Sequence, residues 1–442
     1  MKRRGLRFAV LGMLALVVML GLAVLGGVFN KSPVSPQVKK PLSAEQMQSL
    51  LPRGRELALA GDCFGCHSQT QGPRGSGGVA IDTPFGTLHS TNITPDPKYG
   101  IGNYTREDFH RVLRDGVAPG GRNLYPAMPY VFTHITRPDD IDALYAYFMS
   151  IEPMAVPNVP NTGVFQFPVR PFMNFWNLLN FPDREPPSRA DRSEQWVRGA
   201  YLVEGLGHCA ACHTPQNFMM GTNFSRPFKG GEIEGVRVPD ITAKALSERG
   251  FNVATLSQYL STGVAPQGTA YADMYTVVHF STSAMQPEDV EAIATYLLTG
   301  PTGKIAPAAP APQPLPGVSA PSNGTSSDAG ESDRTVGRFT YASACAGCHG
   351  AKGEGIPNVA PAMYGNSTLG SDSPHNLIKV ILEGIPTQVF ANGQRMYAMP
   401  GFSNELNDKT IANLATWLRA QWGGKRAPVT VEQVNAVVRA ID

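Results

Sequence analysis

Three short stretches decide the fold: Cys63-Phe-Gly-Cys66-His67, Cys209-Ala-Ala-Cys212-His213 and Cys345-Ala-Gly-Cys348-His349. They use all six cysteines of the 442-residue chain, so no thiol is left for a disulfide. The pattern C-x-x-C-H is the attachment signature of a c-type haem, because two thiols on one helical turn reach the two vinyl groups of one porphyrin. The next residue places an imidazole under the iron as its proximal ligand. We therefore predict three covalently bound haem c groups, ligated by His67, His213 and His349.

Two other chemistries use paired cysteines, and both fit less well. A zinc site would need further cysteines or paired histidines nearby, and no such pair follows any of the three motifs. A thioredoxin-like dithiol would not need histidine at the fifth position three times over.

The N-terminus indicates where the chain is located. Lys2, Arg3, Arg4 and Arg7 precede an uncharged apolar run over residues 8–29, which is long enough to span a bilayer. No clear A-x-A cleavage site follows, so we expect an uncleaved anchor rather than a cleaved signal. Basic residues keep the N-terminus cytoplasmic, which places the rest on the periplasmic side of the inner membrane. The net charge of +2 gives no electrostatic reason to expect nucleic acid.

Internal similarities indicate that the chain repeats one structural unit. The segment 53–57 before the first motif resembles the segment 198–202 before the second. Downstream, segments 138–147 and 287–296 both open with proline and acids and then show apolar residues at helical spacing, and 404–417 plays the same part after the third motif. Each unit is therefore expected to run from a helix through the haem motif and long loops to a closing helix.

The expected fold is mostly α, with three tandem class I-type cytochrome c modules after an N-terminal transmembrane helix. The Pro/Ala-rich composition of 301–332 is typical of a semi-rigid spacer, which we expect to keep the third module apart. The predicted layout is an anchor or signal at 1–30, module 1 at 45–155, a connector at 156–190, module 2 at 191–300, a linker at 301–332, module 3 at 333–425 and a tail at 426–442.

Two segments have alternative interpretations. Residues 171–181 of the connector are dense in aromatic and apolar side chains, which could pack between modules 1 and 2 or contact a partner subunit or the membrane surface. In the tail, Val431, Val434, Val438 and Ile441 form one helical stripe, which could cover its own module or bind a partner.

A low-spin haem needs a second axial ligand, and methionine is the usual one in such modules. Met128 and Met399 each lie just before a closing helix and each precede proline. The second module offers Met274 or Met285, and spacing favours Met274, because His67 to Met128 and His213 to Met274 are both 61 positions. We predict Met128, Met274 and Met399 as sixth ligands. The alternative is a bis-His haem that uses one of the other histidines: His89, His110, His134, His208, His279 or His375.

The segment Pro84-Phe-Gly-Thr-Leu-His-Ser-Thr-Asn-Ile-Thr-Pro-Asp-Pro97, followed by Gly100-Ile-Gly-Asn-Tyr104, resembles the first module of the three-haem cytochrome c subunits of membrane-bound quinone-dependent dehydrogenases. This family serves alcohol, aldehyde, gluconate, sorbitol and fructose dehydrogenases of acetic acid bacteria and relatives. Pro239-Asp-Ile-Thr242 is a weaker echo in the second module. The resemblance covers about residues 45–425. The N-terminal anchor is a departure, since many relatives have a cleaved signal, and it favours an aldehyde dehydrogenase of the molybdopterin type.

The resemblance implies that a separate catalytic subunit oxidises the substrate in the periplasm and that electrons pass through this chain to membrane ubiquinone. The chain itself would not be an enzyme, because three irons with two protein ligands each leave no open position for substrate. Alternatives are a haem peroxidase, a cytochrome subunit of a terminal oxidase, or a soluble electron shuttle. The sequence does not name the substrate, the quinone site or the order of the haems.

Overall fold

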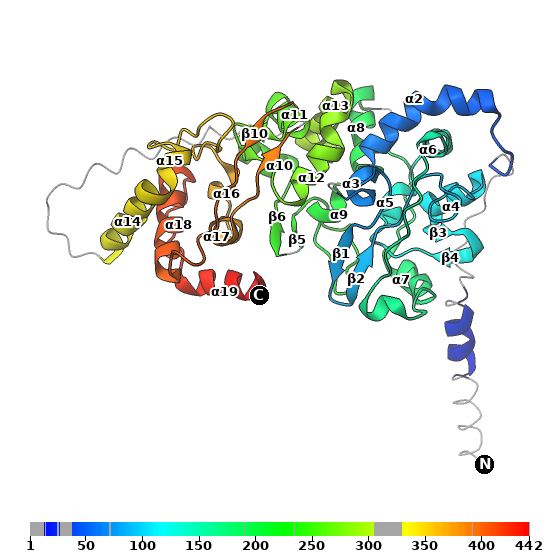
Figure 1. Ribbon diagram of the computed structural model, residues 1–442, viewed down its shortest axis with the longest axis horizontal. Coiled ribbons are helices and arrows are strands. Elements are labelled where there is room, and N and C mark those ends of the chain that lie inside the picture. Colours follow the sequence, from blue (N-terminus) through cyan, green and yellow to red (C-terminus); the bar gives the residue numbers. More distant parts are fainter. Residues whose placement is uncertain are drawn as a thin grey trace, which may run out of the picture. The chain divides into compact units, whose positions relative to one another are not determined.

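The computed structural model describes residues 13, 15–23, 26, 38–69, 72–189, 191–233, 235–304, 329–390 and 392–441. These residues are mostly helical, with five separate antiparallel two-stranded sheets among them. Most of the predicted anchor and linker lies outside these ranges. Residues 15–23 are helical, and no helix in the described ranges is both long and apolar enough to cross a membrane. The described chain forms two compact units (Figure 1).

The first unit comprises Met1–Ser188, Tyr201–Ala211 and Gln216–Thr222. Its helix α2 begins at Ala44 because Ser43 and Gln46 form a capping box, in which each side chain accepts a hydrogen bond from the other's backbone N–H. The elements that follow are α3 (Cys63–His67), the hairpin β1 (Ala80–Thr83) and β2 (Gly86–His89), α4 (Arg106–Asp115), β3 (Val117–Ala118), β4 (Arg122–Asn123), α5 (Tyr130–Thr133), α6 (Pro138–Ser150), the 3-10 turn η2 (Gly163–Gln166) and α7 (Phe172–Asn180).

The second unit comprises Arg189–Ala200, Cys212–Pro215 and Asn223–Asp442. Its first half contains most of α8 (Glu194–Glu204), the end of α9 (Ala210–His213), β5 (Gly231–Ile233), β6 (Val236–Val238), α10 (Ala243–Glu248), α11 (Val253–Thr262), β7 (Val264–Ala265), β8 (Gly268–Thr269), α12 (Asp273–Phe280) and α13 (Pro287–Thr299). Its second half contains α14 (Ala329–Thr340), α15 (Ala346–His349), α16 (Ser367–Gly370), α17 (His375–Glu383), β9 (Gln388–Val389), β10 (Arg395–Met396), α18 (Asp408–Trp422) and α19 (Val431–Ile441).

Three glycines allow three pairs of helices to cross at backbone contact. A Cβ on Gly54 of α2 would overlap the Ala143 carbonyl of α6, and a Cβ on Gly199 of α8 would overlap the Ala292 carbonyl of α13. The third crossing is between α14 and α18, where a Cβ on Gly337 would overlap the Asn413 carbonyl. Only glycine fits such an approach, because any larger residue would force the two helices apart. The helix before each haem motif therefore packs directly on a helix that follows it.

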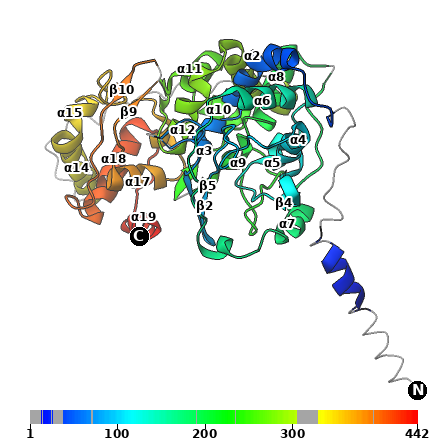
Figure 2. The ribbon, with the colours of Figure 1, turned by 45° about the vertical axis from the view of Figure 1, so that its right-hand side comes forward.

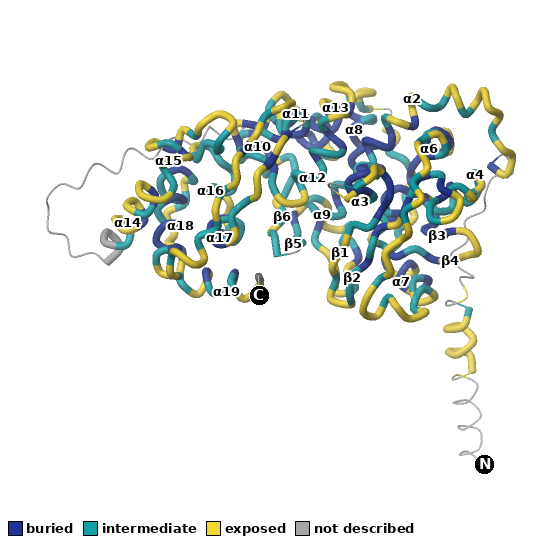
Figure 3. Tube along the Cα trace, in the orientation of Figure 1, coloured by how far each residue is buried: buried dark blue, intermediate teal, exposed yellow. Residues whose placement is uncertain are grey.

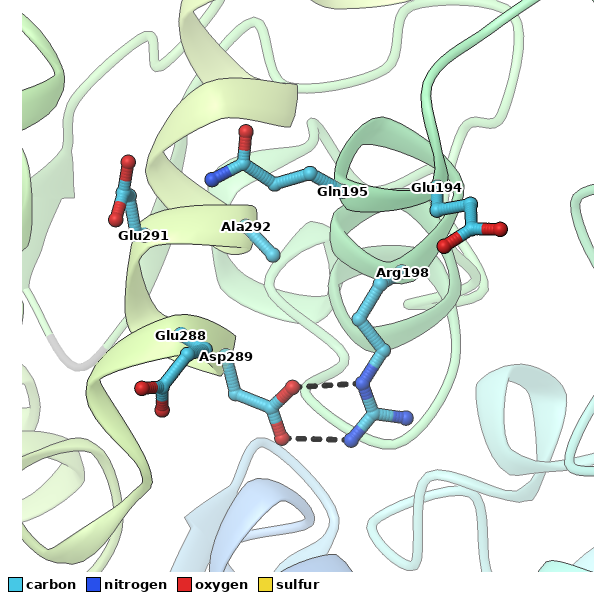
Figure 4. Close-up of a pocket in the computed structure, with 7 residues that line it drawn as sticks. All are labelled: Glu194, Gln195, Arg198, Glu288, Asp289, Glu291 and Ala292. Carbon is cyan, nitrogen blue, oxygen red and sulfur yellow. Dashed lines mark hydrogen bonds and ion pairs between the residues drawn. The ribbon is translucent and has the colours of Figure 1, made fainter.

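In each of the first two helix pairs, an ion pair joins the two helices, and it occupies the equivalent position in both. Arg53, next to Gly54, donates to Asp140 at the start of α6 (2.9 Å). Arg198, next to Gly199, donates both Nε and an Nη to Asp289 at the start of α13 (2.7 and 2.6 Å). Figure 4 shows this second pair at the edge of a shallow hollow between α8 and α13. The hollow is lined by acidic and amide side chains of the two helices, so it belongs to the helix crossing.

The closing helices confirm the predicted starts in two cases and correct the third. Helices α6 and α13 begin at Pro138 and Pro287, as expected from proline at the first helical position. Helix α18 begins at Asp408 and not near 404, because the Asn407 side chain accepts the backbone N–H of Thr410 and caps the helix there.

The C-terminal helix α19 covers its own core. Val434 and Val437 are buried in one cluster with residues of α17 and α18, and Val431 and Val438 pack at its edge. The predicted stripe omitted Val437, which the structure shows to be central, and its last member, Ile441, has a side chain that lies outside the described residues. Of the two uses expected for the tail, the structure shows the first.

The two halves of the second unit are packed together. The Tyr275 hydroxyl donates to the Val389 carbonyl (3.0 Å), and the Tyr275 ring meets Phe390 edge-on at 5.4 Å. Arg237 and Asn376 exchange backbone–side-chain hydrogen bonds. The expectation that the Pro/Ala-rich linker keeps the third module apart is therefore wrong, because these side chains join it to the second.

Candidate haem sites

Each C-x-x-C-H motif ends in a short helix. The first motif forms α3, whereas α9 contains the second motif without Cys209 and α15 contains the third motif without Cys345. All six thiols are free of disulfides. Burial raises the pKa of the first cysteine of each motif, to about 12 for Cys63 and about 11 for Cys209 and Cys345. The thiols of a reactive dithiol have lowered pKa values, so these three cysteines do not resemble one.

Each of the three motif histidines donates the same type of hydrogen bond, from its Nδ1–H to a backbone carbonyl. The Nδ1–H of His67 donates to the Thr91 carbonyl (2.6 Å), that of His213 to the Pro239 carbonyl (2.8 Å), and that of His349 to the Pro361 carbonyl (2.9 Å). Such a bond fixes the ring and the tautomer, and it leaves the Nε2 lone pair for a metal. Burial lowers the pKa of all three imidazoles, to about 4 for His213, so the rings are neutral near pH 7.

The carbonyl partners of the first two histidines come from one repeated turn. Asn92 follows Thr91, and its side-chain oxygen accepts both the backbone N–H and the hydroxyl of Thr94. In the second site Asp240 follows Pro239 and accepts the same two bonds from Thr242. The shared pattern, Asn/Asp-Ile-Thr, marks in the sequence the residue that holds the proximal histidine. The sequence shows this Asn/Asp-Ile-Thr pattern twice, but only the structure shows that the residue before it accepts the hydrogen bond of the histidine.

A second feature near the motifs has only a weak sequence signal, because Asp and His adopt positive φ more often than most residues. Asp62 and His208, which directly precede the first cysteines of sites one and two, have φ values of 46° and 36°. This left-handed conformation is costly for residues other than glycine. It changes the direction of the backbone between the preceding helix and the haem-motif turn. The third site differs, because a π-helical segment, Tyr341–Cys345, leads into α15 without such a break.

The three predicted sixth ligands lie in different kinds of local structure. Met128 is half-buried just before α5, Met274 is half-buried in α12, and Met399 is half-buried between β10 and α18. The Met399 backbone is fixed by two hydrogen bonds with Ile385 (both 2.9 Å). Met285, the rejected candidate, is buried directly before α13. Met128, Met274 and Met399 stay predictions as ligands.

Four of the other histidines already have protein partners. The rings of His110, His134, His208 and His375 contact Asp142, the Arg184 N–H, the Leu206 carbonyl and the Gly235 carbonyl, respectively. Burial lowers the pKa of His134 to about 4. A histidine that ligates a haem iron needs one ring nitrogen without a hydrogen bond. In each of these four histidines one ring nitrogen is hydrogen-bonded, so only its second nitrogen could bind iron. His89 and His279 each have a buried Nδ1 with no hydrogen-bond partner.

The donor set fits a haem c group and does not fit a metal ion held by side chains alone. Two cysteines and a fixed neutral histidine on one turn are the residues that covalent haem requires. Within the described ranges, no group of three or more histidines, cysteines or carboxylates could hold a metal ion. The fold and the sites are those of a c-type cytochrome.

Comparisons with known proteins agree with this class. Residues 336–422 match the family model for cytochrome c. The chain is similar to the cytochrome subunit of fructose dehydrogenase of Gluconobacter japonicus, at 34% identity over 91% of this chain and 86% of that one. It is also similar to the cytochrome c subunit of gluconate 2-dehydrogenase of Pantoea cypripedii, at 34% identity over 88% of this chain and 89% of that one.

A further relative is a nicotinate dehydrogenase subunit of Pseudomonas putida, which is 39% identical over 89% of this chain. The chain spans about a third of the length of that protein, since the match covers 32% of it. The chain belongs to the family of cytochrome c subunits of dehydrogenase complexes, with covalently bound haem c. It is an electron-transfer subunit and not a catalytic one.

Proposed function

We propose that this chain carries three haem c groups in three modules and passes electrons from a periplasmic dehydrogenase subunit to ubiquinone in the inner membrane. The proposal of three haems is supported mainly by one observation. His67, His213 and His349 each donate a hydrogen bond from Nδ1 to a backbone carbonyl. The same requirement, a fixed ring with a free Nε2, is met three times. The repeated glycine crossings at Gly54, Gly199 and Gly337 support three modules independently.

The chain's residues have defined tasks in this proposal. Cysteine pairs would anchor the groups, histidines would ligate the irons, and Met128, Met274 and Met399 would complete the coordination. Bound haem c supplies a reversible one-electron couple, whose potential depends on the axial ligands and on burial. The protein's contribution is to hold each ring, exclude water and keep the sites close together.

Packing in the second unit supports transfer between the second and third sites. Phe390 and Met396 of the third module are buried in one cluster with Met274 and Tyr275 of α12 at its edge. Met396 lies three positions before Met399, so helix α12, which carries Met274, meets the segment that leads to Met399 in this cluster. We infer that electrons cross between these two modules here.

The dehydrogenase partner and the membrane location are supported by the family and by the N-terminal sequence. Relatives are named as subunits of fructose, alcohol, gluconate and nicotinate dehydrogenases. The apolar run of residues 8–29 after four basic residues supports an anchor that leaves the rest of the chain in the periplasm. Neither feature selects the substrate, because the catalytic subunit would determine it.

Copurification from solubilised membranes tests the proposal. The chain should bring down a larger dehydrogenase subunit and should contain three haems per polypeptide by haem assay. Addition of the partner's substrate, tested as alcohols, aldehydes, gluconate, fructose and nicotinate, should reduce the haems, and a ubiquinone analogue should reoxidise them. A chain that purifies alone and reduces peroxide or oxygen would be a peroxidase or an oxidase subunit, and this proposal would be wrong.

A further inference from the structure

Helix α7 has its polar side buried and its apolar side exposed. Asn174, Trp176, Asn177 and Asn180 are all buried. Their hydrogen bonds hold the helix in place: Asn123 donates to Asn174 (2.8 Å), Tyr130 to Asn177 (2.6 Å), Asn217 to Asn180 (2.7 Å), and Trp176 donates to the Met219 carbonyl (2.9 Å). Because these bonds are specific and mostly buried, the helix cannot turn its apolar side inward without leaving the polar groups unpaired.

The outward side of α7 consists of four large apolar residues. Phe172, Phe175, Leu178 and Leu179 are 57%, 47%, 55% and 58% exposed. Residues 172–180 contain no charged side chain. Figure 3 shows the alternation of buried and exposed residues along this helix. An amphipathic helix of a globular protein normally buries its apolar stripe, so this arrangement is reversed.

The exposed apolar surface continues beyond α7 within the same unit. Phe167 and Val164 of the preceding segment are 67% and 45% exposed, and Phe85 at the tip of the β1–β2 hairpin is 54% exposed. The Val164 N–H donates to the Phe85 carbonyl (2.8 Å), which fixes the hairpin tip against η2. Figures 1 and 2 both show α7 and this hairpin at one edge of the unit. We call these seven residues the α7 apolar surface: Phe85, Val164, Phe167, Phe172, Phe175, Leu178 and Leu179.

We propose that the α7 apolar surface inserts into the interfacial layer of the membrane and holds the first unit against the bilayer. This inference rests on the proposed anchor at residues 8–29. Only residues 30–43 separate that run from α2, and an extended chain of this length reaches at most about 50 Å. A compact unit of this size has a radius of gyration of roughly 16 Å, so the tether keeps the α7 apolar surface within reach of lipid.

The chemistry of the surface favours lipid over a protein partner. Phe, Leu and Val side chains offer neither a hydrogen-bond donor nor an acceptor. Binding hot spots of protein interfaces are enriched in Trp, Tyr and Arg, whereas Leu and Val are under-represented there. The one tryptophan of α7 is turned inward, where its N–H is satisfied by Met219. A face of purely apolar side chains on a helix suits the boundary between headgroups and acyl chains.

Site-specific photocrosslinking in native membranes tests this inference on the full haem-loaded chain. A photoreactive phenylalanine analogue is placed at Phe175 or at Leu179 and, as the control, at Phe339. Phe339 is 61% exposed on α14, outside the surface in question. After illumination, mass spectrometry of the chain should show adducts of phospholipid mass at 175 and 179 and none at 339.

Two outcomes would overturn the inference. Adducts of 175 and 179 with another polypeptide would assign the surface to a protein partner. No adduct at either position, with the haem absorbance of the chain unchanged, would leave the surface in water. Both outcomes are distinct from failure of the proposed function. If the chain fractionates with soluble proteins, the anchor is wrong; if it stays in the membrane fraction without lipid adducts, only the role of α7 is wrong.

Discussion

Replacing Gly199 by alanine should destabilise the second unit, because the backbones of α8 and α13 touch at this position. An added Cβ would overlap the Ala292 carbonyl oxygen and would lie 2.9 Å from the Tyr296 Cβ. Neither is the end of a flexible side chain, so the helices themselves would have to separate. Overpacking of this kind costs about 3 kcal/mol at the upper end of the usual range.

An opposing effect reduces this cost. Alanine is favoured over glycine by about 1 kcal/mol inside a helix. The net loss of unfolding free energy should therefore be about 2 kcal/mol. For a unit of this size that corresponds to a fall in Tm of roughly 4–8 °C.

Calorimetry of the full haem-loaded chain measures this shift, and Gly370→Ala is the matched control. Gly370 lies at the end of α16 in the same unit, where an added Cβ would meet only the Gly423 carbonyl at an ordinary 3.6 Å. The control should change stability by less than about 0.5 kcal/mol. If both variants melt at the same temperature, the close crossing of α8 and α13 does not hold the second module together.

Three further predictions concern particular contacts, and two of them have a matched control substitution. Met274→Ala should remove one of three Met–iron absorption signatures. Met285→Ala, the control, should lower the unfolding free energy by about 3 kcal/mol and keep all three signatures. Three surviving signatures in Met274→Ala would show that the ligand is misassigned. Asp142→Asn should cost about 2 kcal/mol at pH 7, because the Asp142 carboxylate accepts bonds from Arg106 and His110. Burial acts to raise the pKa of Asp142, but these hydrogen bonds outweigh burial and the pKa is lowered. The stability that the Asp142 carboxylate contributes is therefore present above about pH 3.8 and is lost as the pH falls through the folded-state pKa. If Asp142→Asn loses the same unfolding free energy at pH 7 and at pH 3 in denaturant titrations, this reasoning is contradicted. Asn177→Ala should cost about 1–3 kcal/mol in urea unfolding by leaving the buried Tyr130 hydroxyl without its acceptor, while Leu178→Ala on the exposed side should be nearly neutral.

The sequence predicted the parts of each site that lie close together in the chain. The cysteines and histidine of each motif are within five positions, so their placement on one turn follows from helical geometry. The closing helices α6 and α13 were predictable for a similar reason, since proline and acids mark their starts. Local rules place local features, and they identified the class of protein.

Partners that are distant in sequence could not be predicted in the same way. The carbonyl that holds His67 is 24 positions away, and that of His349 is 12 positions away in an unrelated loop. A backbone carbonyl has no residue type, so no composition rule identifies it. The left-handed conformation of Asp62 and His208 has only a weak residue signal, because Asp and His adopt positive φ more often than most residues but do not require it.

The docking of the third module shows why linker composition is a poor guide to module placement. A Pro/Ala-rich segment sets how far two modules can separate, but it does not set whether their surfaces adhere. Adhesion here depends on Phe390, which lies against Gly263 at a distance that only glycine allows, and on Tyr275, which bonds the Val389 backbone. These residues lie at the end of α11, in α12, and in β9 and the residue after it. A spacer of this composition is long enough to let the two halves of the second unit reach this contact, at whose edge Met274 of α12 packs.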